Sequence, residues 1–226
     1  MSLSAIIVAA GNGSRIKRFP TESQKQTKQL TPLDGIPVVV RSILQFEECE
    51  FVDDIIVVAR EDELSFYDDY QFKKVKYVVK GGETRQQSVM NGFKYVKSDY
   101  AAIHDGARCL VTPEMIERVA HEAYIHGCAT AAEKAKDTLK QSDADDFITA
   151  TVDRSQIWRA QTPQIFKTEI YQAAIEQNIE VTDDCMLVEN LGYKIKLVDC
   201  GYENIKITTP DDFYLAEAIL KVRKHV

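Results

Sequence analysis

The stretch Ala5–Arg15, AIIVAAGNGSR, decides the fold. Its six apolar residues, Ala5–Ala10, stop at Gly11, as in a buried parallel strand that feeds a tight loop. A loop with two glycines presents bare backbone N–H groups, which bind phosphate oxygens well. Because an ordinary turn has the same composition, the rest of the chain must decide between a plain turn and a phosphate-binding loop.

The residues around this loop favour a nucleoside triphosphate over a redox cofactor. A dinucleotide-binding loop would continue with Gly or Ala at position 16, where helix and strand pack closely. Position 16 is Ile, and the cationic Arg15 precedes it. The next expected strand, 55–59, is followed by Arg60 where such an enzyme has an acidic residue. These residues argue against a dehydrogenase.

Composition narrows the class of protein. With 226 residues, 45% hydrophobic and 28% charged, the chain has the composition of an ordinary globular protein. The net charge of −7 argues against nonspecific nucleic-acid binding, and no apolar run has the roughly 20 residues of a membrane helix. Five scattered cysteines without a CxxC pair predict reduced thiols in a cytoplasmic protein, with no zinc site.

Strand-like and helix-like segments alternate along the chain. Strands are expected at 5–10, 55–59, 75–79, 101–103 and 128–132, and helices at 38–48, 83–96, 113–124, 168–177, 183–191 and 211–222. Such alternation predicts an α/β protein with a mostly parallel, Rossmann-like sheet between two helical layers. Without repeats or a linker, residues 1–226 are expected to form one domain. Ligands of such sheets bind at the carboxyl ends of the strands.

Residues 133–160 break this alternation. Segments 136–140 and 147–152 alternate polar and apolar residues and flank an acidic turn at 142–146. They predict a β-hairpin that projects from the sheet as an arm. Because an isolated hairpin is unstable in water, we expect the arm to pack on a partner subunit.

Basic side chains recur at loop ends on one side of the expected sheet. They are Arg15, Lys25, Lys28, Arg85, Arg108, Arg154 and Lys206. Each alone is typical of a solvated surface, but their shared placement indicates a site for a triphosphate and a phosphorylated second substrate.

Asp105 ends the strand near 101–103 inside a loop of small residues. A carboxylate there suits Mg²⁺, which takes one or two acidic ligands and completes its shell with water and phosphate. The alternative is that Asp105 caps a turn. We expect the neighbouring His104 to form structural hydrogen bonds rather than act as a base.

A set of collinear motifs resembles the 2-C-methyl-D-erythritol 4-phosphate cytidylyltransferase family. The matching segments cover nearly the whole chain and are 9–15, 28–29, 81–88, 104–108, 137–138, 151–154, 161–164, 182–183 and 204–208. The resemblance implies a three-layer nucleotidyltransferase fold. It also implies that the hairpin is a dimerisation arm, which makes the protein a homodimer.

The resemblance also implies residue roles. Arg15 and Lys28 would be catalytic, stabilising charge on the α-phosphate and on pyrophosphate, and Asp105 would bind Mg²⁺. The residues implied to bind CTP are Ala9, Ala10, Gly11, Gly13, Gly81, Gly82, Arg85, Ser88, Asp105 and Gly106. The residues implied to bind the sugar phosphate are Arg108, Thr138, Arg154, Thr162 and Lys206.

Three departures from the family pattern matter. Thr27 replaces the usual proline before Lys28, and the longer segment 15–28 leaves Lys25 as an alternative catalytic lysine. Gly106 and Cys109 depart from the commoner Ala-Ala-Arg-Pro after Asp105.

The expected activity is transfer of CMP from CTP to 2-C-methyl-D-erythritol 4-phosphate. The first alternative is a ribitol-5-phosphate cytidylyltransferase, which the run 151–158 favours less. A non-catalytic dimeric nucleotide-binding protein is the second alternative, and the presence of Arg15, Lys28 and Asp105 argues against it.

Overall fold

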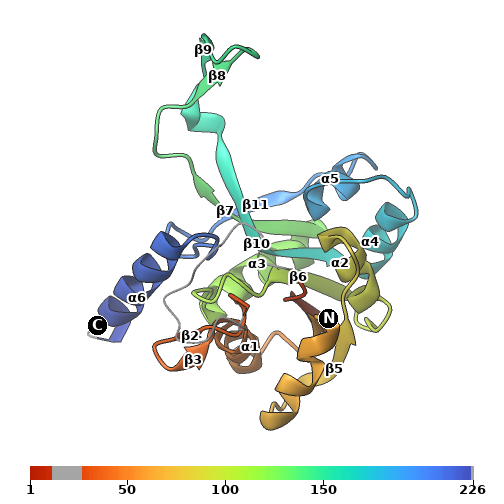
Figure 1. Ribbon diagram of the computed structural model, residues 1–226. Coiled ribbons are helices and arrows are strands. Elements are labelled where there is room, and N and C mark those ends of the chain that lie inside the picture. The colour runs from red at the N-terminus through yellow and green to blue at the C-terminus, as the bar shows by residue number, and fades with distance from the viewer. Residues whose placement is uncertain (12–26, 225–226) are drawn as a thin grey trace.

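A seven-stranded sheet organises the molecule, of which the computed structural model describes residues 1–11 and 27–224. The strand order is β11-β7-β10-β6-β1-β4-β5 (Figure 1). In chain order these strands are β1 (Leu3–Val8), β4 (Asp54–Ala59), β5 (Val75–Lys80), β6 (Tyr100–Asp105), β7 (Cys128–Lys134), β10 (Trp158–Lys167) and β11 (Lys196–Asp199). Only β10 runs antiparallel to its neighbours in this sheet, which confirms the expected α/β architecture.

The position of β1 in the sheet explains why its residues 5–8 are all apolar. Ala5 and Ile7 pack into the core on one face of the sheet, whereas Ile6 and Val8 pack into the core on the other. Successive side chains of a strand point to opposite faces, so a strand covered on both sides is apolar on both faces rather than at alternate positions.

Helices cover both faces of the sheet (Figure 1). On one face lie α1 (Val38–Glu48) and α3 (Pro113–His126). On the other face lie α2 (Arg85–Phe93), α4 (Thr168–Ile175) and α5 (Asp184–Glu189). The C-terminal α6 (Pro210–Lys224) packs beside the small hairpin of β2 (Pro32–Leu33) and β3 (Ile36–Pro37). None of the helices within the described ranges is long and apolar enough to cross a bilayer.

The parallel strands bring their carboxyl ends to one edge of the sheet. Strands β1, β4, β5 and β6 point the same way, so Gly11, Arg60, Gly81 and Asp105 follow or end neighbouring strands at this edge. The short helix η1 (Glu61–Asp69) follows β4 there. Gly11, Gly81 and Asp105, which the sequence predicts to be functional, therefore lie along this edge.

Two strands of the seven-stranded sheet, β10 and β11, were not expected from the sequence. Gln161, Thr162 and Gln164 of β10 are polar yet buried, so the strand lacks the apolar pattern that marks most buried strands. Its pairing with β7 also shifts register between Ala160 and Gln164.

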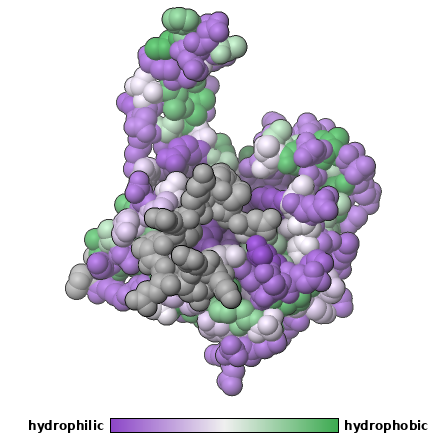
Figure 2. All heavy atoms as spheres, viewed as in Figure 1, coloured by the Kyte–Doolittle hydropathy of each residue, from purple (hydrophilic) through white to green (hydrophobic). Residues whose placement is uncertain are grey.

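The predicted hairpin forms an arm that extends from the body of the molecule (Figure 1). Its ladder pairs β8 (Lys140–Ser142) with β9 (Ile148–Thr151), so the first strand lies closer to the turn than the expected 136–140. Phe147 is 71% exposed and Ile148 is 66% exposed, and hydrophobic residues gather at the tip of the arm (Figure 2). The arm thus carries apolar side chains that its own subunit leaves uncovered.

Candidate active site

A pocket of about 150 Å³ opens where β6 ends. Ten residues of the described chain line it, and five of them are predicted site residues: Arg85, Asp105, Arg108, Thr162 and Lys206. They come from α2, β6, the loop after β6, β10 and the segment before α6. The fold therefore brings together side chains that lie up to 121 positions apart in the sequence.

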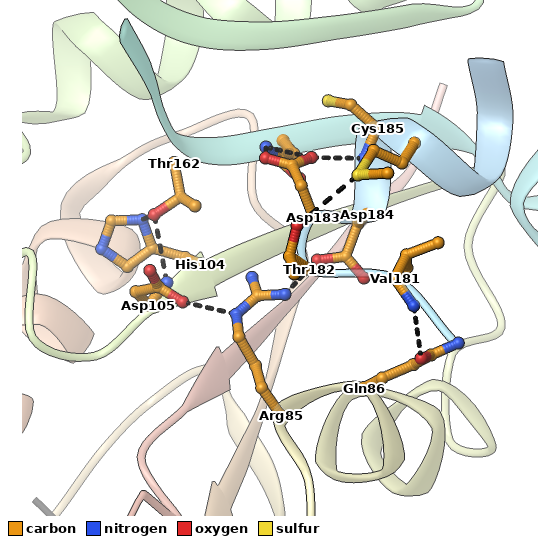
Figure 3. Close-up of polar contacts among 12 residues, drawn as sticks. Arg85, Gln86, His104, Asp105, Thr162, Val181, Thr182, Asp183, Asp184 and Cys185 are labelled. Carbon is orange, nitrogen blue, oxygen red and sulfur yellow. Dashed lines mark hydrogen bonds and ion pairs between the residues drawn. The ribbon is translucent and has the colours of Figure 1, made fainter. Parts of the chain in front are cut away.

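Asp105 is the electrostatic centre of this pocket. Only 7% of the residue is exposed, and its two carboxylate oxygens accept separate hydrogen bonds from cations. Arg85 Nε lies 2.9 Å from Oδ1 (Figure 3), and Lys206 Nζ lies 2.6 Å from Oδ2. Burial alone would raise the pKa of Asp105, but Arg85 and Lys206 outweigh it and hold the pKa far below its usual value. The carboxylate is therefore charged throughout the working pH range.

His104 is buried beside Asp105 and is not available as a base. Burial lowers the pKa of His104 to about 3, so the imidazole is neutral near pH 7. Its Nε2 lies 3.2 Å from the Arg108 carbonyl, which only accepts, so Nε2 carries the proton. Nδ1 then accepts from the Thr162 hydroxyl, 3.1 Å away. These contacts agree with the structural role expected for His104.

Thr162 is thereby oriented by protein groups. Its hydroxyl donates to His104 and accepts from the Asp105 backbone N–H at 3.1 Å (Figure 3). Thr162, which was predicted to bind the sugar phosphate, lines the pocket, but its hydroxyl proton is already donated to His104. In this arrangement the side chain fixes the end of β6.

Arg108 is held at the pocket wall by backbone carbonyls. Its Nη1 donates to the Asn204 carbonyl at 2.8 Å and its Nη2 to the Ala160 carbonyl at 3.3 Å. The buried Asn204 side chain in turn donates to Gln161 Oε1 at 3.0 Å and to the Thr162 carbonyl at 2.9 Å. With Arg85 and Lys206, Arg108 gives the pocket three cations, a charge pattern suited to phosphate.

The glycines at the end of β5 form the wall of a second pocket, of about 200 Å³, with Ala10. The Ser88 hydroxyl accepts from the Gly82 N–H at 3.0 Å and donates to the Thr84 carbonyl at 2.9 Å. Thr84 also caps α2, because its side chain accepts from the Gln87 N–H. The Ser88 side chain therefore stabilises the conformation of the glycine loop through its hydrogen bonds to Gly82 and Thr84.

Gly81 has no room for a side chain. A Cβ on Gly81 would lie 2.2 Å from the Ala10 Cβ and 2.9 Å from Ser88 Oγ, so the two loops meet only because position 81 is bare. We expect Gly81→Ala to push the loops apart, to weaken binding of the CTP that the family resemblance implies at least about tenfold, and to cost about 1–3 kcal/mol of stability. Calorimetric titration with CTP and thermal unfolding check both effects.

Gly11→Ala is the matched control for the stability effect. A Cβ on Gly11 meets no described atom within 4 Å. Its melting temperature should stay close to that of the wild-type protein. Equal loss of stability in the two variants would contradict the steric account of Gly81.

Lys28 lies beside the segment that carries Lys206. Its Nζ donates to the Ile207 carbonyl at 3.1 Å, and the Ile207 N–H donates to the Ala107 carbonyl at 2.9 Å. This places Lys28 next to the loop that follows Asp105. The remaining loop residues predicted for the site, Gly13 and Arg15, and the alternative lysine, Lys25, lie outside the described residues.

The other predicted residues fall into two groups. Ala9 and Gly106 are buried at the strand ends, where their N–H groups donate to the carbonyls of Val58 and Val8. Thr138 and Arg154 are exposed on the arm and do not line the 150 Å³ pocket of their own chain. The structure therefore separates these two from the sugar-phosphate residues with which the sequence grouped them.

Sequence reasoning assigned no role to Gln164, which lines the pocket, or to Asp184 and Asn204, which hold its Arg85 and Arg108 from just outside the lining. Gln164 Nε2 donates to both oxygens of Asp183, at 3.1 Å each, and Asp184 receives Arg85 Nη1. Gln164 and Asn204 lay within quoted motifs, but only the fold shows that their side chains are buried among these groups. Asp184 was indistinguishable from an acidic residue in the first turn of a helix.

Comparisons with known proteins agree with this geometry. The chain matches the family model described as 2-C-methyl-D-erythritol 4-phosphate cytidylyltransferase over residues 3–222. It is 41% identical to the protein of that name from Caldanaerobacter subterraneus subsp. tengcongensis, over 98% of this chain and 100% of the relative. The namesake from Clostridium acetobutylicum is 44% identical over 96% of each chain. The crystal structure of 4-diphosphocytidyl-2C-methyl-D-erythritol synthase from Anaerococcus prevotii superposes with a TM-score of 0.83 at 31% identity, covering 97% of this chain and 98% of that one.

Proposed function

Because the chain belongs to the 2-C-methyl-D-erythritol 4-phosphate cytidylyltransferase family, we propose that it transfers the cytidylyl group of CTP to 2-C-methyl-D-erythritol 4-phosphate. The products are 4-diphosphocytidyl-2-C-methyl-D-erythritol and pyrophosphate. The observation that carries the proposal to this chain is the cluster of Arg85, Arg108 and Lys206 around the buried Asp105 carboxylate. This cluster lies at the same sheet edge as the glycine loops that would receive CTP.

The reaction needs positioning and charge neutralisation rather than proton removal. An oxygen of the 4-phosphate attacks the α-phosphorus of CTP in line, while the bond from that phosphorus to the bridging oxygen of pyrophosphate breaks. The nucleophile is already an anion, so no general base is required. The neutral and fully engaged His104 fits such a site.

The proposed residue roles follow from placement. Lys28 and Arg15 would stabilise the charge that develops on the α-phosphate and the leaving group. Gly81 and Gly82 would receive cytosine against their backbone, and Ser88 would act through its hydrogen bond to Gly82. The remaining cations, Arg108 and Lys206, would bind the phosphate of the second substrate.

Mg²⁺ fits the donor set around Asp105. No cluster of three or more acidic, His or Cys side chains in the described chain could hold a metal by itself. A single carboxylate suits an ion that takes its remaining ligands from triphosphate oxygens and water. Each Asp105 oxygen accepts a hydrogen bond from one cation, Arg85 or Lys206, and keeps a further lone pair. When bound there, Mg²⁺ would neutralise charge on the triphosphate.

Asp105→Asn tests this role. The change removes the charge but keeps the side chain's size, so we expect the Mg²⁺ concentration for half-maximal rate to rise at least about tenfold, since hard cations bind carboxylate better than amide oxygen. Arg85 keeps Asp184 as a partner and Lys206 is partly exposed, so the variant should remain folded. Rates over a Mg²⁺ titration and circular dichroism check the two statements.

Asp68→Asn provides the control, because Asp68 is exposed on η1. It should leave the titration unchanged. A wild-type titration curve for a folded Asp105→Asn variant would remove Asp105 from the metal site.

We further propose that the arm completes the site of a second copy of the chain. Thr138 and Arg154 are exposed on the arm, away from their own subunit's pocket, and Phe147 and Ile148 at its tip are uncovered. Packing of the arm on a partner would bury these apolar side chains and bring the cationic Arg154 to the partner's sugar phosphate. The active unit would then be a homodimer.

Product identification tests the proposed reaction. Incubation with CTP, Mg²⁺ and 2-C-methyl-D-erythritol 4-phosphate should give, by ³¹P NMR, the two coupled signals of a diphosphate diester together with pyrophosphate. Omission of either substrate should abolish both products. Release of CMP or inorganic phosphate without a diester would point instead to hydrolysis of CTP and would overturn the proposal.

A further inference from the structure

Arg85 lies between two carboxylates from different parts of the chain. Its Nε meets Asp105 Oδ1 at 2.9 Å, and its Nη1 meets Asp184 Oδ2 at 2.5 Å (Figure 3). Arg85 and Asp105 line the pocket at the end of β6, whereas Asp184 is not among its lining residues. The Asp184 side chain is only 1% exposed and holds Arg85 from behind the residues that line the pocket.

Asp184 is itself fixed by a tyrosine. The hydroxyl of Tyr171 donates to Asp184 Oδ1 at 2.6 Å, so each oxygen of the carboxylate has one partner. The Tyr171 ring is fully buried, edge-on to Phe93 at 5.0 Å and stacked on Phe166 at 5.2 Å. A ring packed in this way gives the hydroxyl little freedom to move.

Arg85 keeps its charge between the carboxylates of Asp105 and Asp184. Burial would lower the pKa of Arg85, but Asp105 and Asp184 outweigh it and raise the pKa. Arg85 thus stays charged and is shared between two anions. A buried ion pair contributes little net stability compared with apolar packing, because desolvation offsets the attraction. The buried contact of Arg85 with Asp184 is therefore better explained by its orienting Arg85 than by its contribution to folding stability.

We propose that Asp184 and Tyr171 are positioning residues for the nucleotide site. They hold the far nitrogen of Arg85, which keeps Nε directed at Asp105 and fixes that carboxylate for the bound nucleotide. Without this anchor, Arg85 would meet Asp105 alone, and the guanidinium and carboxylate would both gain freedom. This inference rests on the proposed CTP-dependent function, since it gives Asp105 and Arg85 a nucleotide to receive.

Two variants separate positioning from plain stability. Tyr171→Phe removes one hydroxyl and keeps the packed ring, and Asp184→Asn keeps the shape and removes the charge. We expect the dissociation constant of Mg²⁺·CTP, measured by calorimetry, to rise about fivefold for Tyr171→Phe and about tenfold or more for Asp184→Asn, the scale of a hydrogen bond to a charged group. The value of kcat should fall by similar factors. Tyr124→Phe on α3 is the matched control and should match the wild-type protein, because Tyr124 lies on the opposite face of the sheet, stacked on Phe51.

A double-mutant cycle tests whether the anchor acts through Arg85. In an Arg85→Gln background, Asp184→Asn should change Mg²⁺·CTP affinity by less than about twofold, because the group it positions is gone. Full, independent effects of the two changes would overturn the proposal. So would wild-type affinity and kcat in a folded Tyr171→Phe variant, which decides the matter even if Asp184→Asn does not fold. The binding of Mg²⁺·CTP is measured without the second substrate, so it tests the positioning role alone. The product analysis by ³¹P NMR tests the proposed transfer reaction separately.

Discussion

Lys28→Ala is expected to lower kcat by about a hundredfold or more at saturating substrates, the scale of losing one charge contact made in the transition state. The ammonium group lies beside the loop after Asp105, bound to the Ile207 carbonyl at 3.1 Å. From there it can approach the phosphates of a nucleotide seated between the glycine loops and Asp105. Steady-state rates of pyrophosphate release give kcat directly.

Lys25→Ala is the matched control for this prediction. Lys25 and Lys28 are three residues apart, and the family pattern alone left both as candidates. The placement of Lys28 against the segment of Lys206 favours Lys28. A severe effect of Lys25→Ala together with a mild effect of Lys28→Ala would show that the assignment is wrong.

Mixing two inactive variants is expected to restore activity. If Arg154 serves the partner's site while Arg15 serves its own, Arg15→Ala and Arg154→Ala should each be nearly inactive alone. A mixed dimer then carries one site with both arginines intact. Random reassociation of equal amounts makes about half of the dimers mixed, so activity should return to about a quarter of the wild-type value.

This experiment has a clear control and a clear opposite outcome. Differently tagged subunits, purified on both tags, prove that mixed dimers have formed. Mixing either variant with itself should restore nothing. Proven mixed dimers without recovery would mean that both arginines act in the same site from one chain, and the arm would then only hold the subunits together.

Much of the fold could be predicted because its central strands β1, β4 and β6 are buried on both faces. Residues 5–8 of β1 and 55–59 of β4 are continuous hydrophobic runs, and α1 begins and ends as expected. Strand β10 could not be predicted, because Gln161, Thr162 and Gln164 are polar. They can be buried only because each forms a hydrogen bond with a distant segment of the chain. A local pattern does not contain those partners.

The site residues also divide into those that local sequence patterns could predict and those that depend on distant partners. Asp105 and Arg85 follow strand ends or glycines, so their shared position at one sheet edge could be predicted from topology. The tie between Arg85 and Asp184 joins residues 99 positions apart, at the first turns of α2 and α5. No spacing rule reports such a contact, and Asp184 was consequently missed.

The comparison of two acceptor substrates tests the central claim most directly. Pyrophosphate release should be measured with CTP and Mg²⁺ and either 2-C-methyl-D-erythritol 4-phosphate or ribitol 5-phosphate. The family assignment predicts that kcat/KM is higher for methylerythritol phosphate by at least about a hundredfold, because a site built to hydrogen-bond one polyol leaves polar groups unpaired with another. An equal or higher kcat/KM for ribitol 5-phosphate would contradict the assignment.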